Sequence, residues 1–374
     1  MRVGIDARSL TSARPSGVEH YVINLIRSLA ALPERPDITA YTDGPLADAE
    51  VEEAIGDKIQ IKAVRARRGW LRGALPWRLW RDRVQVAHFP STILPPLLPC
   101  PAVVTVHDLA WMRYPETYDA ADLEMQTQVV PRSIRRARRV IAVSENTARD
   151  LAEMLGVPRD KITVVALGVS SEFSPEGGRP PRYAFSGAER LAEGCVLHAA
   201  GGFHPRKNVA RVLEAYARAK GRCEMPPLVV AGGQGSQSLE DLKGRTVRLG
   251  IAEDVIFPGH LPEAVLAACL RAAVVAVYPS LYEGFGLPIL EAMASGTPVI
   301  TSDRSSMVEV AGEAALLVNP EDVEELASAL VRVLSDEALR GDLRARGLAR
   351  SREFSWQRTA QQTVAVYRRA ARAG

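Results

Sequence analysis

The sequence has few cysteines, no long apolar run and no leader pattern. The four cysteines are Cys100, Cys195, Cys223 and Cys269. They are far apart and form no CxxC pair, so neither a disulfide framework nor a zinc site is indicated. No stretch approaches the ~20 uncharged apolar residues that span a bilayer, and the start MRVGIDARSL leads into a strand pattern rather than a signal peptide. We therefore expect reduced thiols in a cytoplasmic protein without a transmembrane anchor.

The sequence also has little net positive charge. Only six of the 47 basic residues are lysines, and 44 acidic residues leave a net charge of +3. This excess is too small to indicate nucleic-acid binding, so we expect no nucleic-acid partner. Any function that depends on positive charge must come from a local cluster.

Several catalytic motifs are missing. The chain has no GxxxxGK[ST] loop, no GxSxG elbow and no HExxH, which argues against P-loop nucleotide hydrolysis, hydrolase triads and zinc peptidases. It also has no Asp-x-Asp, the usual carboxylate pair for a metal that bridges a diphosphate. A departing phosphate would then be neutralised by cationic side chains and helix dipoles, and we expect no metal and no other cofactor.

Length and patterning predict two α/β domains. A chain of 374 residues with 47% hydrophobic and 24% charged residues is typical of a globular protein of two domains. Strands are predicted at 1–6, 37–42, 58–64, 84–88, 102–107, 139–143, 162–165, 196–200, 228–231, 255–257, 273–277, 298–301 and 314–317. Helical patterns between them indicate mostly parallel sheets.

A segment rich in Pro, Gly and Ser over 168–194 interrupts this alternation and marks a domain boundary. We assign residues 1–180 to the first domain and 181–354 to the second. A last helix over about 355–374, capped by Ser355, is expected to pack back on the first domain. Two open α/β domains leave a cleft between them, where the carboxyl ends of strands bind ligands.

The segment PSLYEGFGLPILEAMASGTPVI, residues 279–300, carries the strongest pattern. A glycine loop with Gly284 and Gly286 follows a strand, and Pro288 begins a helix. Glycine lets backbone N–H groups approach a ligand, and the start of a helix offers unsatisfied donors with a positive dipole end. This arrangement suits a phosphate group.

Two glutamates eight positions apart lie in the same segment. Glu283 is on the loop and Glu291 is about one turn into the helix. Carboxylates accept hydrogen bonds from vicinal hydroxyls, so this pair could hold a sugar at one end and a ribose at the other.

A second candidate segment is GGFHPRKN, residues 201–208. It is again a strand end, a glycine turn and a helix start, with Arg206 and Lys207 adjacent. Two cations at a helix start reinforce the attraction of the dipole for a diphosphate.

The first half of the chain offers weaker candidates. His107 ends an apolar strand and Asp108 follows it, so the pair could bind sugar hydroxyls. Gly17 precedes a helix and could bring backbone amides to a phosphate.

Taken together, these segments resemble the retaining glycosyltransferases of family 4, which have the GT-B fold of two Rossmann-like domains facing across a cleft. The motifs in family order are SGVEHYVINLIRSL, VVTVHDLAWMRYPETY, HPRKN, VIFPGHLPE, SLYEGFGLPILEAMASGTPVI and EVAGEAALLVNP. The HDLAWMRYPE motif is most similar to bacterial mannosyltransferases that build O-antigen and other polysaccharides. The resemblance implies hexose transfer from a nucleotide-diphospho-sugar, best guessed as GDP-mannose, to a glycan or lipid-linked acceptor.

The resemblance also implies residue roles. Arg206 and Lys207 would bind the diphosphate, Glu291 the ribose hydroxyls and Glu283 the donor sugar. His107 would lie beside the anomeric centre, with Asp108 on the acceptor side. The amides of Phe285, Gly286 and Leu287 would bind the distal phosphate, and Ile256 and Phe257 would border the nucleobase. Gly17 and Gly284 are added to the donor contacts from the glycine patterns described above.

One departure and several alternatives remain. Similar sequences often read Thr-x-Glu-Pro-Arg-Lys where this chain has Gly202, Phe203 and His204 before Pro205, so an acidic donor contact is absent. A UDP-, ADP- or dTDP-sugar donor, a sugar-nucleotide epimerase of the same fold and a non-catalytic membrane- or nucleic-acid-binding protein are the alternatives.

The segment Lys62–Arg83 is both basic and aromatic. It holds eight basic residues, one acidic residue and the tryptophans Trp70, Trp77 and Trp80. Such a segment can lie on an anionic membrane surface with its indoles at headgroup level. This predicts peripheral association at the inner face of the membrane, while the alternative is a loop whose tryptophans pack on the domain.

Overall fold

The computed structural model describes residues 1–374 except 12–16, 48–54, 67–68, 182–183, 234 and 373–374. The chain divides into two compact units. The first is Met1–Arg113, Asp119–Gly168 and Phe354–Gly374, and the second is Tyr114–Tyr118 and Val169–Glu353. The change of unit at Gly168 comes before the boundary at residue 180 that the loss of periodicity suggested.

The first unit is built on a seven-stranded parallel sheet of order β3-β2-β1-β4-β5-β6-β7. Its strands are β1 (Arg2–Asp6), β2 (Asp37–Thr42), β3 (Gln60–Ala63), β4 (Val86–Phe89), β5 (Ala102–Val106), β6 (Arg139–Ala142) and β7 (Ile162–Val164). Its helices are α1 (Gly17–Ala31), α3 (Leu75–Arg81), α4 (Ala110–Arg113), α5 (Ala120–Arg136), α6 (Glu145–Leu155) and α14 (Trp356–Arg372).

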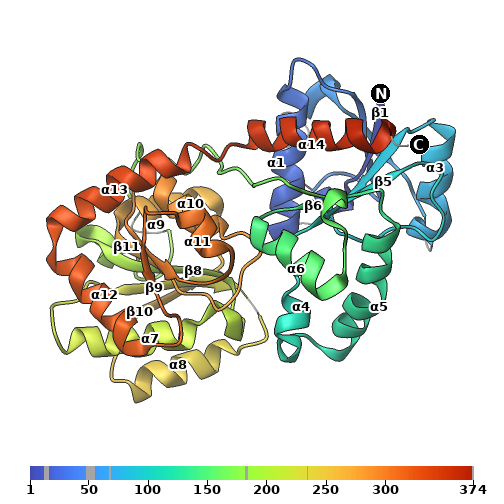
Figure 1. Ribbon diagram of the computed structural model, residues 1–374. Coiled ribbons are helices and arrows are strands. Elements are labelled where there is room, and N and C mark those ends of the chain that lie inside the picture. The colour runs from blue at the N-terminus through green and yellow to red at the C-terminus, as the bar shows by residue number, and fades with distance from the viewer. Residues whose placement is uncertain (12–16, 48–54, 67–68, 182–183, 234, 373–374) are drawn as a thin grey trace. The chain divides into compact units, whose positions relative to one another are not determined.

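The last helix, α14, belongs to this unit and lies along α1 and beside the strands β4, β5 and β6 (Figure 1). Ser355 caps it, because its Oγ accepts a hydrogen bond from the Arg358 backbone amide at 3.2 Å. Its buried face includes Tyr367, whose hydroxyl is 2.8 Å from Nδ1 of the buried His88 on β4. A polar contact in the core therefore fixes this helix on the sheet, in addition to apolar packing.

The second unit is built on a six-stranded parallel sheet of order β10-β9-β8-β11-β12-β13. Its strands are β8 (Cys195–Gly202), β9 (Leu228–Gly233), β10 (Val255–Gly259), β11 (Ala273–Tyr278), β12 (Val299–Ser302) and β13 (Leu316–Val318). Its helices are α7 (Val209–Lys220), α8 (Leu239–Arg248), α9 (Glu263–Ala272), α10 (Leu287–Ala294), α11 (Ser305–Ala311), α12 (Val323–Ser335) and α13 (Glu337–Ser351).

Two parallel sheets with helices between successive strands confirm the predicted α/β class. In the second unit, the order of the strands reverses between β8 and β11, which are neighbours although β9 and β10 separate them in sequence. Ligands of open parallel sheets bind at the carboxyl ends of strands beside such a reversal. None of the described helices is long and apolar enough to cross a membrane.

Candidate active site

Glu283 is the centre of a charged cluster in the second unit. Its carboxylate accepts hydrogen bonds from Arg206 Nη1 at 3.0 Å and from Lys207 Nζ at 2.7 Å. The side chains of Arg206, Lys207 and Glu283 are only 15%, 12% and 9% exposed. Arg206 and Lys207 follow β8 and Glu283 follows β11, so the neighbouring carboxyl ends of these strands bring together the two segments that the sequence singled out.

Tyr278, the last residue of β11, joins this cluster and was missed in the sequence. Its hydroxyl donates to Glu283 Oε1 at 2.9 Å and accepts from Lys207 Nζ at 2.8 Å. Behind it, the ring of the buried His198 stacks on the Tyr278 ring with centroids 5.9 Å apart. The usable signal was a polar-tipped aromatic residue at the end of an apolar strand, next to the glycine loop.

Backbone contacts fix the position of Glu283 as well. Its carbonyl oxygen accepts hydrogen bonds from the hydroxyls of Ser305 at 2.7 Å and Ser306 at 2.9 Å, both at the start of α11. The Leu281 amide donates to the carbonyl of Arg206 at 2.8 Å, which ties the loop after β11 to the turn after β8. The cluster is therefore held in place without a ligand.

Asn208 holds the cationic turn from the other side. It has a positive φ of 64° and is 2% exposed. Its side-chain amide donates to the carbonyls of Pro279 at 2.9 Å and Pro320 at 2.6 Å. Asparagine tolerates this left-handed conformation better than most residues, so one side chain both turns the chain and anchors it.

The charge state of Glu283 follows from its surroundings. Burial raises the pKa of this carboxyl, but the positive charges of Lys207 and Arg206 and the hydrogen bond from Lys207 outweigh burial and lower it to about 2. Glu283 is thus ionised at neutral pH, and one carboxylate is shared by two cations. The local excess of positive charge can attract a diphosphate.

The glycine loop leads into α10 as the sequence predicted. Gly286 caps this helix with a φ of 109°, and Pro288 lies in the first turn. The positive φ favours glycine at position 286, and a Cβ there would also come within 3.1 Å of the end of the Ile289 side chain. Binding of a phosphate by the amides of Phe285, Gly286 and Leu287 stays a prediction.

Glu291 lies on α10 and is partly buried. Burial, reinforced by repulsion from Glu263, raises the pKa of Glu291 to about 8. This glutamate is therefore mostly protonated in the ligand-free protein at pH 7, unlike Glu283. Its predicted contact with ribose hydroxyls would be made from a half-buried position.

The raised pKa of Glu291 predicts a pH-dependent stability. The folded pKa exceeds the value of 4.5 for a free glutamate, so the stabilisation is present below pH 4.5 and is lost as the pH rises through about 8. We expect Glu291→Gln to raise the melting temperature relative to the parent by an amount that grows from pH 5 to pH 9. Glu253 is exposed, so Glu253→Gln is the control and should show no such trend. A difference in melting temperature between Glu291→Gln and the parent that stays constant from pH 5 to pH 9 would contradict the prediction.

The two residues expected near the nucleobase are mostly involved in packing. Ile256 is 6% exposed and lies against Gly187, where a Cβ would meet its side chain at 3.2 Å. Phe257 packs edge-on against the buried Phe203, with ring centroids 6.5 Å apart. Their contact with a base stays a prediction.

The candidates of the first unit follow β5 and β1. His107 Nε2 lies 3.1 Å from the carbonyl oxygen of Pro90, which can only accept, so Nε2 carries the proton and Nδ1 has the lone pair. Burial lowers the pKa of His107 more than Asp108 and Glu19 raise it, and the ring is neutral at pH 7. Asp108 caps α4 by accepting from the Ala110 amide at 3.0 Å, so part of its carboxylate is used structurally.

Tyr21 on α1 orients His107. The two rings meet edge to face with centroids 4.9 Å apart. The Tyr21 hydroxyl lies 3.1 Å from Thr105 Oγ1, which is itself 2.8 Å from His88 Nε2. This buried chain connects His107 to the core of the sheet. Gly17 begins α1 with open space at its Cβ position, and its role stays a prediction.

The basic aromatic segment is only partly packed. Trp70 is 8% exposed and donates to the Val64 carbonyl at 2.9 Å, whereas Trp77 and Trp80 on α3 are 54% and 68% exposed. Residues 67–68 lie outside the described residues. Of the three tryptophans, only Trp70 packs on the domain, as the alternative interpretation expects for all of them. Membrane association stays a prediction.

Within the described residues, no group of three or more His, Cys, Asp or Glu side chains could hold a metal ion. All four cysteines are free, with Cys195 and Cys269 buried.

Two family models match this chain, each mainly within one of the two units. Residues 15–173 match the family model "Glycosyltransferase Family 4", and residues 193–350 match "Glycosyl transferases group 1". O-antigen chain mannosyltransferase B of Escherichia coli is 32% identical over 78% of this chain and 76% of its own length. The chain belongs to glycosyltransferase family 4.

A second relative and a solved structure support this family assignment and the fold. The MMP alpha-(1->4)-mannosyltransferase of Mycolicibacterium hassiacum is 36% identical over 66% of this chain, although the match spans only 57% of that protein. Sucrose-phosphate synthase from Thermosynechococcus elongatus superimposes with a TM-score of 0.77 over 100% of both chains at 22% identity. The fold is therefore GT-B, and the protein is a glycosyltransferase.

Proposed function

We propose that this protein transfers mannose from GDP-mannose to a hydroxyl group of a glycan or lipid-linked acceptor, with retention of anomeric configuration and without a metal. One observation carries the donor side of the proposal: Arg206 and Lys207 share the single carboxylate of Glu283 beside a glycine loop. The sugar is supported by the two relatives that are named mannosyltransferases.

The chemistry follows from this charge arrangement. As the bond between the anomeric carbon and the diphosphate oxygen breaks, negative charge develops on the leaving group, and Arg206 and Lys207 stabilise it. In a same-face displacement, the departing phosphate takes the proton of the acceptor hydroxyl while the new glycosidic bond forms. No protein side chain then needs to act as a base, which is consistent with an ionised Glu283 that is fully engaged by cations.

Arg206 and Lys207 can replace a metal in this role because their charges are held in position before the donor binds. Glu283 would pass from balancing these cations to contacting the donor sugar, as the family resemblance implies. His107, neutral and held by Pro90 and Tyr21, is proposed to lie beside the anomeric centre and to interact through its dipole rather than through charge.

The donor proposal is tested by thermal-shift and calorimetric titration of the full chain with GDP, UDP, ADP and dTDP and their sugars, in EDTA. A ligand that binds the folded state raises the melting temperature by an amount set by its concentration relative to Kd. We expect GDP and GDP-mannose to give the largest rise in melting temperature and a Kd at least tenfold lower than that of the nucleotides with other bases. Added Mg²⁺ should change this Kd less than twofold. Selectivity for another base would overturn the choice of sugar.

Product analysis separates the remaining alternatives. Incubation with the preferred donor alone, followed by NMR of the sugar nucleotide, should show no change of the sugar. An epimerase of this fold would interconvert the donor without an acceptor. No binding of any nucleotide sugar would instead favour a non-catalytic protein.

A further inference from the structure

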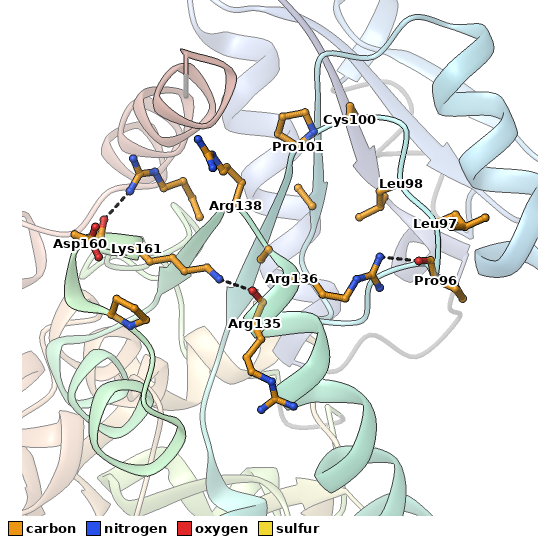
Figure 2. Close-up of a pocket in the computed structure, with 14 residues that line it drawn as sticks. Pro96, Leu97, Leu98, Cys100, Pro101, Arg135, Arg136, Arg138, Asp160 and Lys161 are labelled. Carbon is orange, nitrogen blue, oxygen red and sulfur yellow. Dashed lines mark hydrogen bonds between the residues drawn. The ribbon is translucent and has the colours of Figure 1, made fainter. Parts of the chain in front are cut away.

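A hollow of about 910 Å³ lies in the first unit, away from the candidate residues described above (Figure 2). The residues that line it are Pro96, Leu97, Leu98, Cys100, Pro101, Ala102, Arg135, Arg136, Ala137, Arg138, Arg139, Pro158, Asp160 and Lys161. Ala102 and Arg139 are the first residues of β5 and β6, and Lys161 directly precedes β7. The hollow is therefore at the amino ends of these strands.

The charge of this hollow is strongly unbalanced. Its lining has five cationic side chains and one carboxylate, and it includes most of the run PRSIRRARR, residues 131–139, which was not singled out in the sequence. Within the described part of the chain, none of the five cations forms an ion pair with a carboxylate, Asp160 included. Like charges on a concave wall repel one another and concentrate positive potential in the hollow.

Three of the cations are bonded to neutral carbonyl oxygens. Lys161 Nζ donates to Arg135 O at 2.8 Å, Arg136 donates to Pro96 O at 2.7 Å, and Arg139 donates to Asp160 O at 2.6 Å. These hydrogen bonds fix the direction of the side chains and leave their charges unneutralised. Burial lowers the pKa of Lys161 by more than the negative charge of the neighbouring Asp160 raises it.

The other two arginines are open to a ligand. No side-chain hydrogen bond of Arg135 or Arg138 is formed within the described residues, and in Figure 2 these two side chains point away from each other. Planar guanidinium groups bind phosphate oxygens in a bidentate manner. Leu97, next to Pro96 in the lining, is 75% exposed and adds an apolar rim.

We propose that this hollow is a binding site for a polyvalent phosphate ligand, presented either as a soluble phosphate or by lipid headgroups. β5 begins at Ala102, in the hollow, and ends at Val106. His107 follows directly, so Ala102 and His107 are about 16 Å apart at about 3.3 Å per residue. A phosphate bound here does not reach His107, so the site anchors the protein or its ligand and takes no part in the transfer step. The proposal is independent of the donor sugar.

Inorganic pyrophosphate is the first probe, titrated calorimetrically into the full chain at low ionic strength. Because the cluster around Lys207 can also bind pyrophosphate, all variants carry Lys207→Ala. We expect Arg135→Ser with Arg138→Ser to weaken Kd at least tenfold, and the matched control, Arg132→Ser with Arg149→Ser, to change it less than twofold. Both control arginines are exposed, belong to the same unit and lie outside the hollow.

Vesicle flotation then distinguishes the two sources of phosphate. Binding to phosphatidylglycerol vesicles but not phosphatidylcholine vesicles, lost in the Arg135/Arg138 variant and kept after Trp77→Ser with Trp80→Ser, assigns the site to lipid headgroups. Pyrophosphate binding without vesicle binding assigns it to a soluble phosphate. If the Arg135/Arg138 variant binds both probes as well as its parent, or the parent binds neither, the proposal is wrong.

Discussion

Glu283→Gln is expected to abolish transfer while tightening the binding of a nucleoside diphosphate. The carboxylate that would contact the sugar is removed, and kcat should fall by at least about a hundredfold, the scale of losing one preorganised electrostatic contact. The diphosphate, however, no longer competes with Glu283 for Arg206 and Lys207. Calorimetry with GDP should therefore show a lower Kd than in the parent.

The same variant is expected to be less stable without ligand. Two neighbouring cations that are 15% and 12% exposed lose their shared carboxylate, and breaking a buried pair in this way costs roughly 3–5 kcal/mol. The pKa of Glu283 is lowered to about 2, so its stabilisation is present above the free value near 4.5 and is lost as the pH falls toward 2. The melting temperature of Glu283→Gln should lack this acid-dependent component.

Glu321→Gln is the matched control, since it removes an exposed ion pair with Arg304 in the same unit. It should leave kcat and the Kd of GDP within twofold of the parent. Turnover near the parental value in Glu283→Gln, or a weaker Kd for GDP, would contradict the proposed role.

Lys207→Ala is also expected to abolish transfer, but, in contrast to Glu283→Gln, it should weaken the binding of a nucleoside diphosphate. Loss of the ammonium removes charge stabilisation from the leaving group, so kcat should fall by roughly 10²–10³-fold, and the Kd of GDP should rise tenfold or more. Stability should fall less than in Glu283→Gln, because Glu283 keeps its hydrogen bonds with Arg206 and Tyr278.

Lys220→Ala removes the exposed pair with Asp254 and serves as the control for loss of a lysine charge. It should change neither kcat nor Kd by more than twofold. Equal GDP affinities in Lys207→Ala and Glu283→Gln would show that the two side chains do not compete for one phosphate site.

The elements of the site could be predicted, but their partners could not. The glycine loop, the helix start at Pro288 and the adjacent cations at 206 and 207 are local patterns. That Glu283 binds both cations depends on contacts 76 and 77 positions apart in sequence. Tyr278 was overlooked for the same reason, because its hydroxyl becomes significant only beside Lys207.

Protonation states also required the fold. Glu283 and Glu291 look alike in the sequence, but the pKa of the first is lowered to about 2 and that of the second is raised to about 8. Neighbouring cations determine the first value, while burial and a second glutamate determine the other. Neither environment can be read from spacing.

The sequence alone determined the strands, the alternation with helices, the last helix with its cap at Ser355, and the segments that carry the site, because each depends on residues a few positions apart. The tertiary structure decided the strand orders, the inclusion of Tyr114–Tyr118 in the second unit and of α14 in the first, and the charge pairing at Glu283. It also decided the hollow, which is lined by residues from the segments 96–102, 135–139 and 158–161. These features depend on which strands become neighbours, and that choice is made by packing over the whole sheet rather than by any local pattern.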